Sequence, residues 1–121
     1  MKINEHIDLN ALKTITGGDS EKLLDYIEMY LEQTPDEIDK LKKYFREKNW
    51  SSLEIVAHNM KSKAGYMGIQ KLNELAEAIE EYDYKGDLKK LNDLICNFDK
   101  FFGLVQTELI KEKTRLTELK T

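Results

Sequence analysis

Residues 50–68 read WSSLEIVAHNMKSKAGYMG, and the spacing of apolar residues in this stretch predicts the fold. At about 100° per residue, six apolar side chains fall on one arc of a helix. The stretch does not alternate with period two, so it predicts an amphipathic helix from about Trp50 to Tyr66. The side chains on the arc are Leu53, Val56, Ala57, Met60, Ala64 and Met67.

Typical start and stop residues bound this helix and its neighbours. Asn49 or Ser51 can cap its first turn, and Gly68 can end it. On both sides, apolar residues recur every three or four positions. Before the central helix, this spacing predicts a short helix begun by Asp8 and ended by Gly17 and Gly18, and a long helix from Asp19 or Ser20 to about Arg46 with a restart or kink at Pro35. After it, the spacing predicts a helix from about Gln70 to Tyr84 with Gly86 as its left-handed end, and a last helix over about 87–115 capped by Asp87.

These elements predict an all-α fold. Four long amphipathic helices joined by short turns favour an antiparallel four-helix bundle, and the short additional N-terminal helix would lie across one end. The chain has 121 residues, which fits one domain over 1–121.

Composition excludes several classes of function. The 19 basic and 23 acidic residues are scattered and give a net charge of −4, so we expect no nucleic acid as a partner. No apolar run is long enough to span a bilayer, and the first residues lack the apolar centre of a signal peptide, so we expect no membrane association. Cys96 is the single cysteine, which together with the high lysine content favours a cytoplasmic protein. We also expect a monomer.

His58 breaks the pattern of the central helix. It falls roughly 140° from the centre of the apolar arc, in the middle of the helix, so its side chain is expected to be exposed. Ser62 and Gly65 follow it at one and two turns, which leaves the surface beside the imidazole nearly bare. Spacing alone leaves open two simpler interpretations, in which Gly65 begins the end of the helix and His58 is an ordinary exposed residue.

The sequence around His58 resembles the signature of histidine-containing phosphotransfer (HPt) domains. That signature is Ala-His-x-Leu-Lys-Gly/Ser followed by small residues, a glycine and a leucine, and residues 57–72 read AHNMKSKAGYMGIQKL. Met60 replaces the commoner leucine with a side chain of similar volume, and Ser62 takes a position where glycine is frequent but is still small. The resemblance covers about residues 7–84. Its further matches are Asp8, Leu9, Leu12, Gly17 to Asp19, Tyr30, Leu31, Pro35, Asn49, Trp50, Leu75, Ala76 and Ile79 to Glu81.

The resemblance implies a phosphorelay intermediate of a two-component system. His58 would accept a phosphoryl group from an aspartate of a response-regulator receiver domain and pass it to another receiver. The partners would be receiver domains, a hybrid histidine kinase, or both. The metal would belong to the receiver, so the chain would need no cofactor and no metal of its own. No ATP-binding domain follows the helix, so the chain would not act as an ATP-dependent kinase.

Neighbours of His58 receive roles from their positions on the helix. Lys61 at i+3 can reach an oxygen of a phosphoryl group on the outer ring nitrogen. Glu54 at i−4 is a candidate acceptor for the inner ring N–H, although a solvated glutamate fits the same spacing. Ile55, Ser62 and Gly65 are expected to form the edge and floor of a docking surface for the receiver.

Other functions compete with this interpretation. A helical adaptor that binds partners through its last helix remains the alternative. A di-iron bundle needs Glu-x-x-His pairs that point inwards, and the sequence has none. We assign no role to His6, expect an idle or buried thiol at Cys96, and expect Trp50 to be a packing residue.

Overall fold

The computed structural model describes residues 6–118, and this range is all-helical, as predicted. It contains α1 (Asn10–Thr16), α2 (Ser20–Arg46), α3 (Trp50–Tyr66), α4 (Gln70–Glu80) and α5 (Leu88–Glu118). α3 has the bounds that its apolar arc predicted, and the Asn49 side chain caps it by accepting from the Ser52 N–H.

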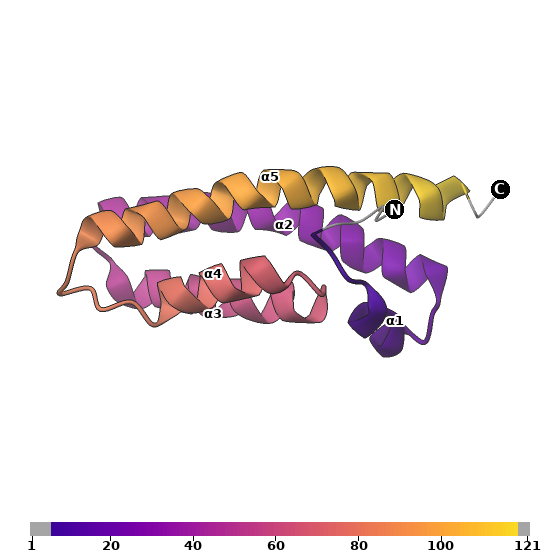
Figure 1. The fold of residues 1–121 in the computed structure, drawn as a ribbon, viewed down its shortest axis with the longest axis horizontal. Helices are drawn as coiled ribbons and strands as arrows, with labels where there is room; N and C mark the ends of the chain where they lie inside the picture. Colours follow the sequence, from indigo (N-terminus) through magenta and orange to yellow (C-terminus); the bar gives the residue numbers. More distant parts are fainter. Residues whose placement is uncertain (1–5, 119–121) are drawn as a thin grey trace.

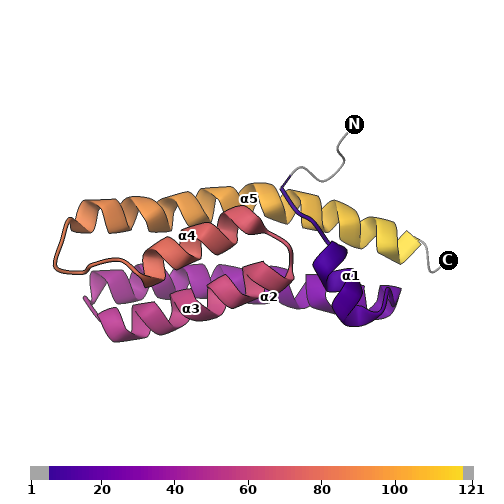
Figure 2. The same cartoon turned by 60° about the horizontal axis from the view of Figure 1, so that its bottom comes forward.

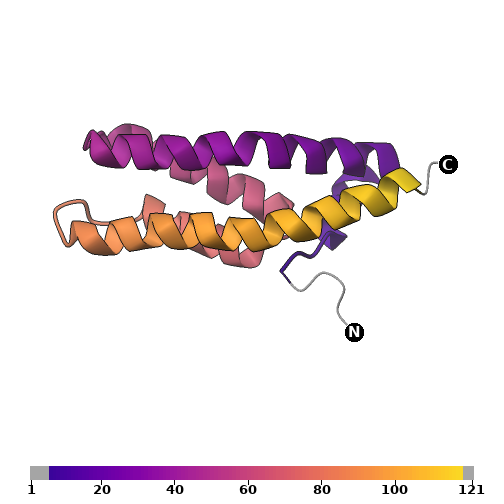
Figure 3. The same ribbon diagram turned by 90° about the horizontal axis from the view of Figure 1, so that it is seen from above.

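The helices form a helical bundle in which each long helix contacts two others. α2 packs against α3 and α5, and α4 packs against the same two helices. Successive long helices run in opposite directions (Figure 1). α2 and α5 lie side by side and extend beyond the two shorter helices (Figure 3). α1 lies beyond the turn that joins α3 to α4, below the extended part of α2 in Figure 1 and in front of it in Figure 2.

The core is built from the apolar stripes of these helices. Its largest fully buried side chains come from every element, and the segment after α3 adds Met67 and Ile69. The burial of a large apolar side chain stabilises the fold by roughly 1.5–3 kcal/mol. The set is Leu12, Ile27, Leu41, Leu53, Met60, Met67, Ile69, Leu72, Ile79, Leu91, Ile95 and Phe98.

The end of α4 differs from the prediction. The helix ends at Glu80 instead of continuing to Tyr84, and Gly86 does not have a positive φ. The reason is aromatic packing after the helix. Tyr84 stacks on Trp50, with ring centroids 5.0 Å apart and an angle of 4° between the planes. The Tyr82 hydroxyl donates to the Asp87 carbonyl oxygen. These contacts hold the connection to α5 in a non-helical path.

Two further details resolve or correct the expected helix boundaries. α2 continues through Pro35, so this proline does not restart the helix. Leu9 and not Asp8 occupies the N-cap position of α1, although the Asp8 carboxylate accepts from the Asn10 N–H at 3.0 Å. The structure confirms Gly17 and Gly68 as left-handed ends, with φ values of 67° and 73°.

Residues 6–9, which precede α1, are anchored, and His6, to which the sequence assigned no role, supplies part of the anchor. The His6 backbone N–H donates to a carboxylate oxygen of Glu108 at 2.8 Å, and its ring Nδ1 pairs with the other oxygen. The Asp8 N–H donates to the Gly68 carbonyl oxygen at 3.0 Å. Residues 6–9 therefore form a strap that ties α5 to the turn between α3 and α4.

Candidate functional site around His58

His58 lies at the middle of α3, with its side chain 58% exposed. This placement agrees with its predicted position away from the core. Directly behind it, Ala57 and Met60 are buried, so the helix beneath the imidazole is fixed by the core. The site is thus an exposed imidazole on a helix that the core holds in place.

Glu80, the last residue of α4, holds the His58 ring. Its Oε1 lies 2.7 Å from His58 Nδ1. The expected acceptor, Glu54, does not make this contact. Side chains at i and i+4 are neighbours on a helix, so the spacing allowed Glu54, but His58 Nδ1 is taken by Glu80. A carboxylate from the neighbouring helix meets the ring instead.

Lys61 completes a three-residue cluster with His58 and Glu80. Its Nζ lies 3.4 Å from Glu80 Oε2, so one carboxylate contacts both the imidazole and the ammonium group. Desolvation raises the pKa of Glu80, but the hydrogen bond from His58 and the charge of Lys61 outweigh it and leave this pKa below its ordinary value. Glu80 is therefore a carboxylate at neutral pH. Lys63 points to α2 and pairs there with Glu37 at 3.2 Å.

The carboxylate sets which ring nitrogen is free. An ionised carboxylate only accepts hydrogen bonds, so in the neutral imidazole the proton sits on Nδ1 and points at Glu80. The lone pair is then on Nε2. The cluster can present this nitrogen as a nucleophile without a separate base.

The remaining predicted site residues lie on the exposed side of α3. Glu54, Ser62 and Gly65 are exposed, and Ile55 is 63% exposed, an unusual value for a large aliphatic side chain. Together with His58 they form a surface strip, here called the His58 face. All five residues are exposed to solvent in the part of the chain that the structure describes.

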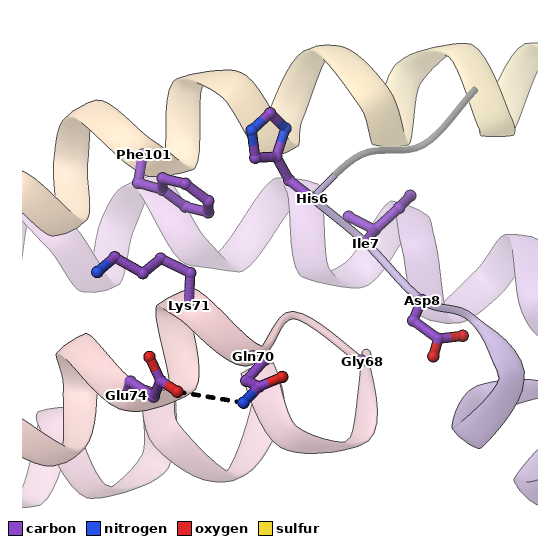
Figure 4. Close-up of a pocket in the computed structure, with 8 residues that line it drawn as sticks. All are labelled: His6, Ile7, Asp8, Gly68, Gln70, Lys71, Glu74 and Phe101. Atoms are coloured by element: carbon purple, nitrogen blue, oxygen red, sulfur yellow. Dashed lines mark hydrogen bonds between the residues drawn. The ribbon is translucent and has the colours of Figure 1, made fainter. Parts of the chain in front are cut away.

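A prominent hollow lies away from this face. It has a volume of about 410 Å³ and is bounded by the strap, the start of α4 and Phe101 (Figure 4). Glu74 and Gln70 hydrogen-bond to each other at its rim, and Lys71 lies beside them.

Within residues 6–118, no group of three or more His, Cys, Asp or Glu side chains could hold a metal ion. No helix in that range is long and apolar enough to cross a membrane.

A simple symmetry could have revealed Glu80 from the sequence. α3 and α4 form a helical hairpin, and Ile69 lies in its turn. His58 and Glu80 each lie eleven residues from Ile69, so they face each other across the hairpin. This symmetry is useful only once α3 and α4 are known to pair antiparallel, and the apolar pattern of a single helix does not give that pairing.

Residues 25–112 match the family model described as Hpt domain, which is more than half of the chain. The chain belongs to the Hpt domain family. A curated relative of this Hpt domain is the phosphorelay intermediate protein YPD1 of Candida albicans, 33% identical over 96 residues. The match covers 79% of this chain but 43% of the relative, so the Hpt domain spans less than half of that protein's length. No solved structure matches the chain.

Proposed function

We propose that this Hpt domain is a phosphorelay intermediate whose acceptor is His58. The observation that carries the proposal is the tie between His58 Nδ1 and Glu80, which leaves Nε2 as the free nucleophile on an exposed ring. Family membership and the relationship to a phosphorelay protein support the same role.

In this proposal the Nε2 lone pair attacks the phosphorus of an aspartyl phosphate on a receiver domain. The N–P bond forms, the bond from phosphorus to the aspartyl oxygen breaks, and the aspartate leaves as a carboxylate. The ring keeps its Nδ1 proton and gains a positive charge, which the Glu80 carboxylate 2.7 Å away offsets. The reverse attack by an aspartate of another receiver returns the ring to the neutral form. No proton has to move in either direction.

Lys61 offsets the charge of the transferred group. Its ammonium lies beside the site through Glu80, and from i+3 its side chain can reach an oxygen of a phosphoryl group on Nε2. Such a contact is worth about 1 kcal/mol in water and up to ~4 kcal/mol when a docked partner lowers the effective dielectric constant to about 20. Phosphoryl transfer depends mainly on position and charge, which this cluster supplies.

The His58 face is the proposed docking surface for receiver domains, including one within a hybrid histidine kinase. Ile55 supplies an apolar contact, and Ser62 and Gly65 leave the approach to the ring open. We propose further that residues 1–121 act as one monomeric, cytoplasmic domain built as an antiparallel four-helix bundle with a short N-terminal helix. In this role the chain carries phosphate and has no ATP-dependent kinase activity of its own.

A purely non-catalytic adaptor is the second candidate. α5 leaves Leu104 52% exposed and Ile110 49% exposed, as a helix with a partner surface would. An adaptor does not need a nucleophile, so a phosphorylation assay separates the two candidates.

The test is labelling by a phosphorylated cognate receiver. The parent chain should acquire acid-labile phosphate, while His58→Gln should fold normally and stay unlabelled. His6→Gln is the matched control because the chain has two histidines, and it should label like the parent. Labelling of His58→Gln at the parental level would refute the proposal.

A further inference from the structure

The inference starts from a contact of Asn73, which lies on α4 opposite Gly65. The Asn73 Nδ2 donates a hydrogen bond to the backbone carbonyl oxygen of Lys61 at 2.8 Å. The bond runs from a side chain of one helix to the backbone of the other. Within the described range, no second bond of this kind joins α3 to α4.

Gly65 leaves the path to this carbonyl open. Inside α3, the Lys61 carbonyl oxygen accepts the regular helical bond from the Gly65 N–H, and its second lone pair is available to Asn73. A Cβ placed on Gly65 would lie 3.4 Å from Asn73 Nδ2, in van der Waals contact. Gly65 therefore borders the Asn73 side chain, and even an added Cβ would leave room for the bond.

α4 has few other polar anchors. It is 11 residues long, and neither its N-cap residue Ile69 nor any other side chain caps its first turn. A hollow of about 320 Å³ lies beside Gly65 and Asn73, and Asp8 and Ala11 line its other side. The buried side chains of α4 determine which face of this helix packs against the core. The hydrogen bond from Asn73 to the Lys61 carbonyl oxygen also restricts movement of α4 along its own axis relative to α3.

The contact is linked geometrically to the His58 site. Asn73 and Gly65 each lie four residues from Ile69, and Glu80 and His58 each lie eleven residues from it. Both pairs are thus rungs of the same hairpin, seven residues apart. A helix rises about 1.5 Å per residue, so a slip of α4 by one residue would carry the Glu80 carboxylate out of hydrogen-bond range of Nδ1.

We propose that Asn73 is a positioning residue for the His58 site. Its bond to the Lys61 carbonyl fixes the register of α4 on α3 and so keeps Glu80 on Nδ1 of His58. Asn73 touches none of the reacting atoms and acts through Glu80. The consequence for phosphotransfer rests on the proposed function, whereas the effect on the His58 ring does not.

The test reads the ring directly. The ratio of the Nδ1–H to the Nε2–H form of His58 is measured by ¹⁵N NMR at a pH of about 8, where a free imidazole is neutral. Asn73→Asp keeps the shape but removes the donor, and Asn73→Ala removes the side chain and favours the helix. Both variants should lower the ratio by about threefold to tenfold. Complete loss of a hydrogen bond to a charged acceptor would set the upper limit of this change.

Two controls bound the result. Glu80→Ala sets the ratio for complete loss of the acceptor. Gln33→Ala removes a hydrogen bond between α3 and α2, from Lys63 to Gln33, and should leave the ratio at the parental value. A general loosening of the fold would move the ratio in Gln33→Ala as well, and that result would contradict the proposal.

The outcomes separate this proposal from the proposed function. A parental ratio in both Asn73 variants overturns the positioning role, whatever the rate of phosphotransfer. In the parent, an NMR coupling across the bond from Asn73 Nδ2 to the Lys61 carbonyl should be observed, and its absence also overturns the role. If the parent takes no phosphate but the ratio falls in the variants, the proposed function fails and the positioning role stands.

Discussion

At the scale of single residues, one carboxylate organises the site. Glu80 receives the imidazole on one oxygen and the Lys61 ammonium near the other. Charge-assisted contacts of this kind are stronger than neutral ones, and here they also choose the free ring nitrogen. Lys61 is therefore held beside His58 before any phosphate arrives. Its contribution can be measured separately from that of the ring.

Lys61→Ala should slow transfer to His58, or shorten the lifetime of the phosphohistidine, by at least about fivefold, because a contact of about 1 kcal/mol with the phosphoryl group is lost. The free energy of unfolding should fall by about 1 kcal/mol or less, since the ion pair is still partly exposed, with 30% of the Lys61 and 18% of the Glu80 side chain accessible. Single-turnover kinetics and chemical denaturation measure the two effects.

Lys63→Ala is the matched control for Lys61→Ala. It removes an ion pair from the same helix, but its partner Glu37 lies on α2. Transfer should keep the parental rate. Equal slowing in both variants would show that Lys61 acts through the fold and not through the phosphoryl group.

At the scale of elements, the turn between α3 and α4 places both functional helices. Gly68 has a φ of 73°, and its backbone lies against the strap, where it accepts from the Asp8 N–H. A Cβ on Gly68 would lie 1.6 Å from the Asp8 carbonyl oxygen. Two requirements, the left-handed backbone and the close approach, therefore coincide at this residue.

Gly68→Ala should lower the free energy of unfolding by several kcal/mol, because the alanine both strains the backbone and displaces the strap. Gly17→Ala separates these effects. Gly17 has a similar φ of 67° with no atom within 4 Å of its added Cβ, so the strain of about 1–2 kcal/mol is its whole cost. Denaturation of the two variants gives the comparison. Equal losses would mean that the strap moves aside freely.

At the scale of the whole molecule, the strap closes the fold. His6 and Glu108 are 102 positions apart, and Glu108 is buried, with 8% of its surface exposed. The His6 ring also meets Phe101 edge-on, with centroids 5.0 Å apart. A buried carboxylate is costly without partners, so this contact makes residues 6–9 part of the stable structure.

His6→Ala should destabilise the chain by about 1–3 kcal/mol, the cost of leaving a buried acceptor short of a partner. Lys113→Ala is the comparison. It removes the exposed ion pair with Glu28, where the two charged atoms are 3.8 Å apart, and should cost about 0.5 kcal/mol or less. Thermal and chemical unfolding measure both. A loss no larger in His6→Ala than in Lys113→Ala would contradict the anchoring role.

The sequence by itself determined the helices and the exposure of His58. Periodicity, caps and left-handed glycines depend on residues within a turn or two of each other, so α3 could be predicted to the residue. Contacts between distant segments decided three features. They are the end of α4, after which Tyr84 stacks on Trp50, the anchoring of His6 on Glu108, and the acceptor for the His58 ring. Glu54 is near His58 along the chain, but Glu80 meets it in space. The register of two packed helices sets such contacts, and the pattern of one helix does not contain it.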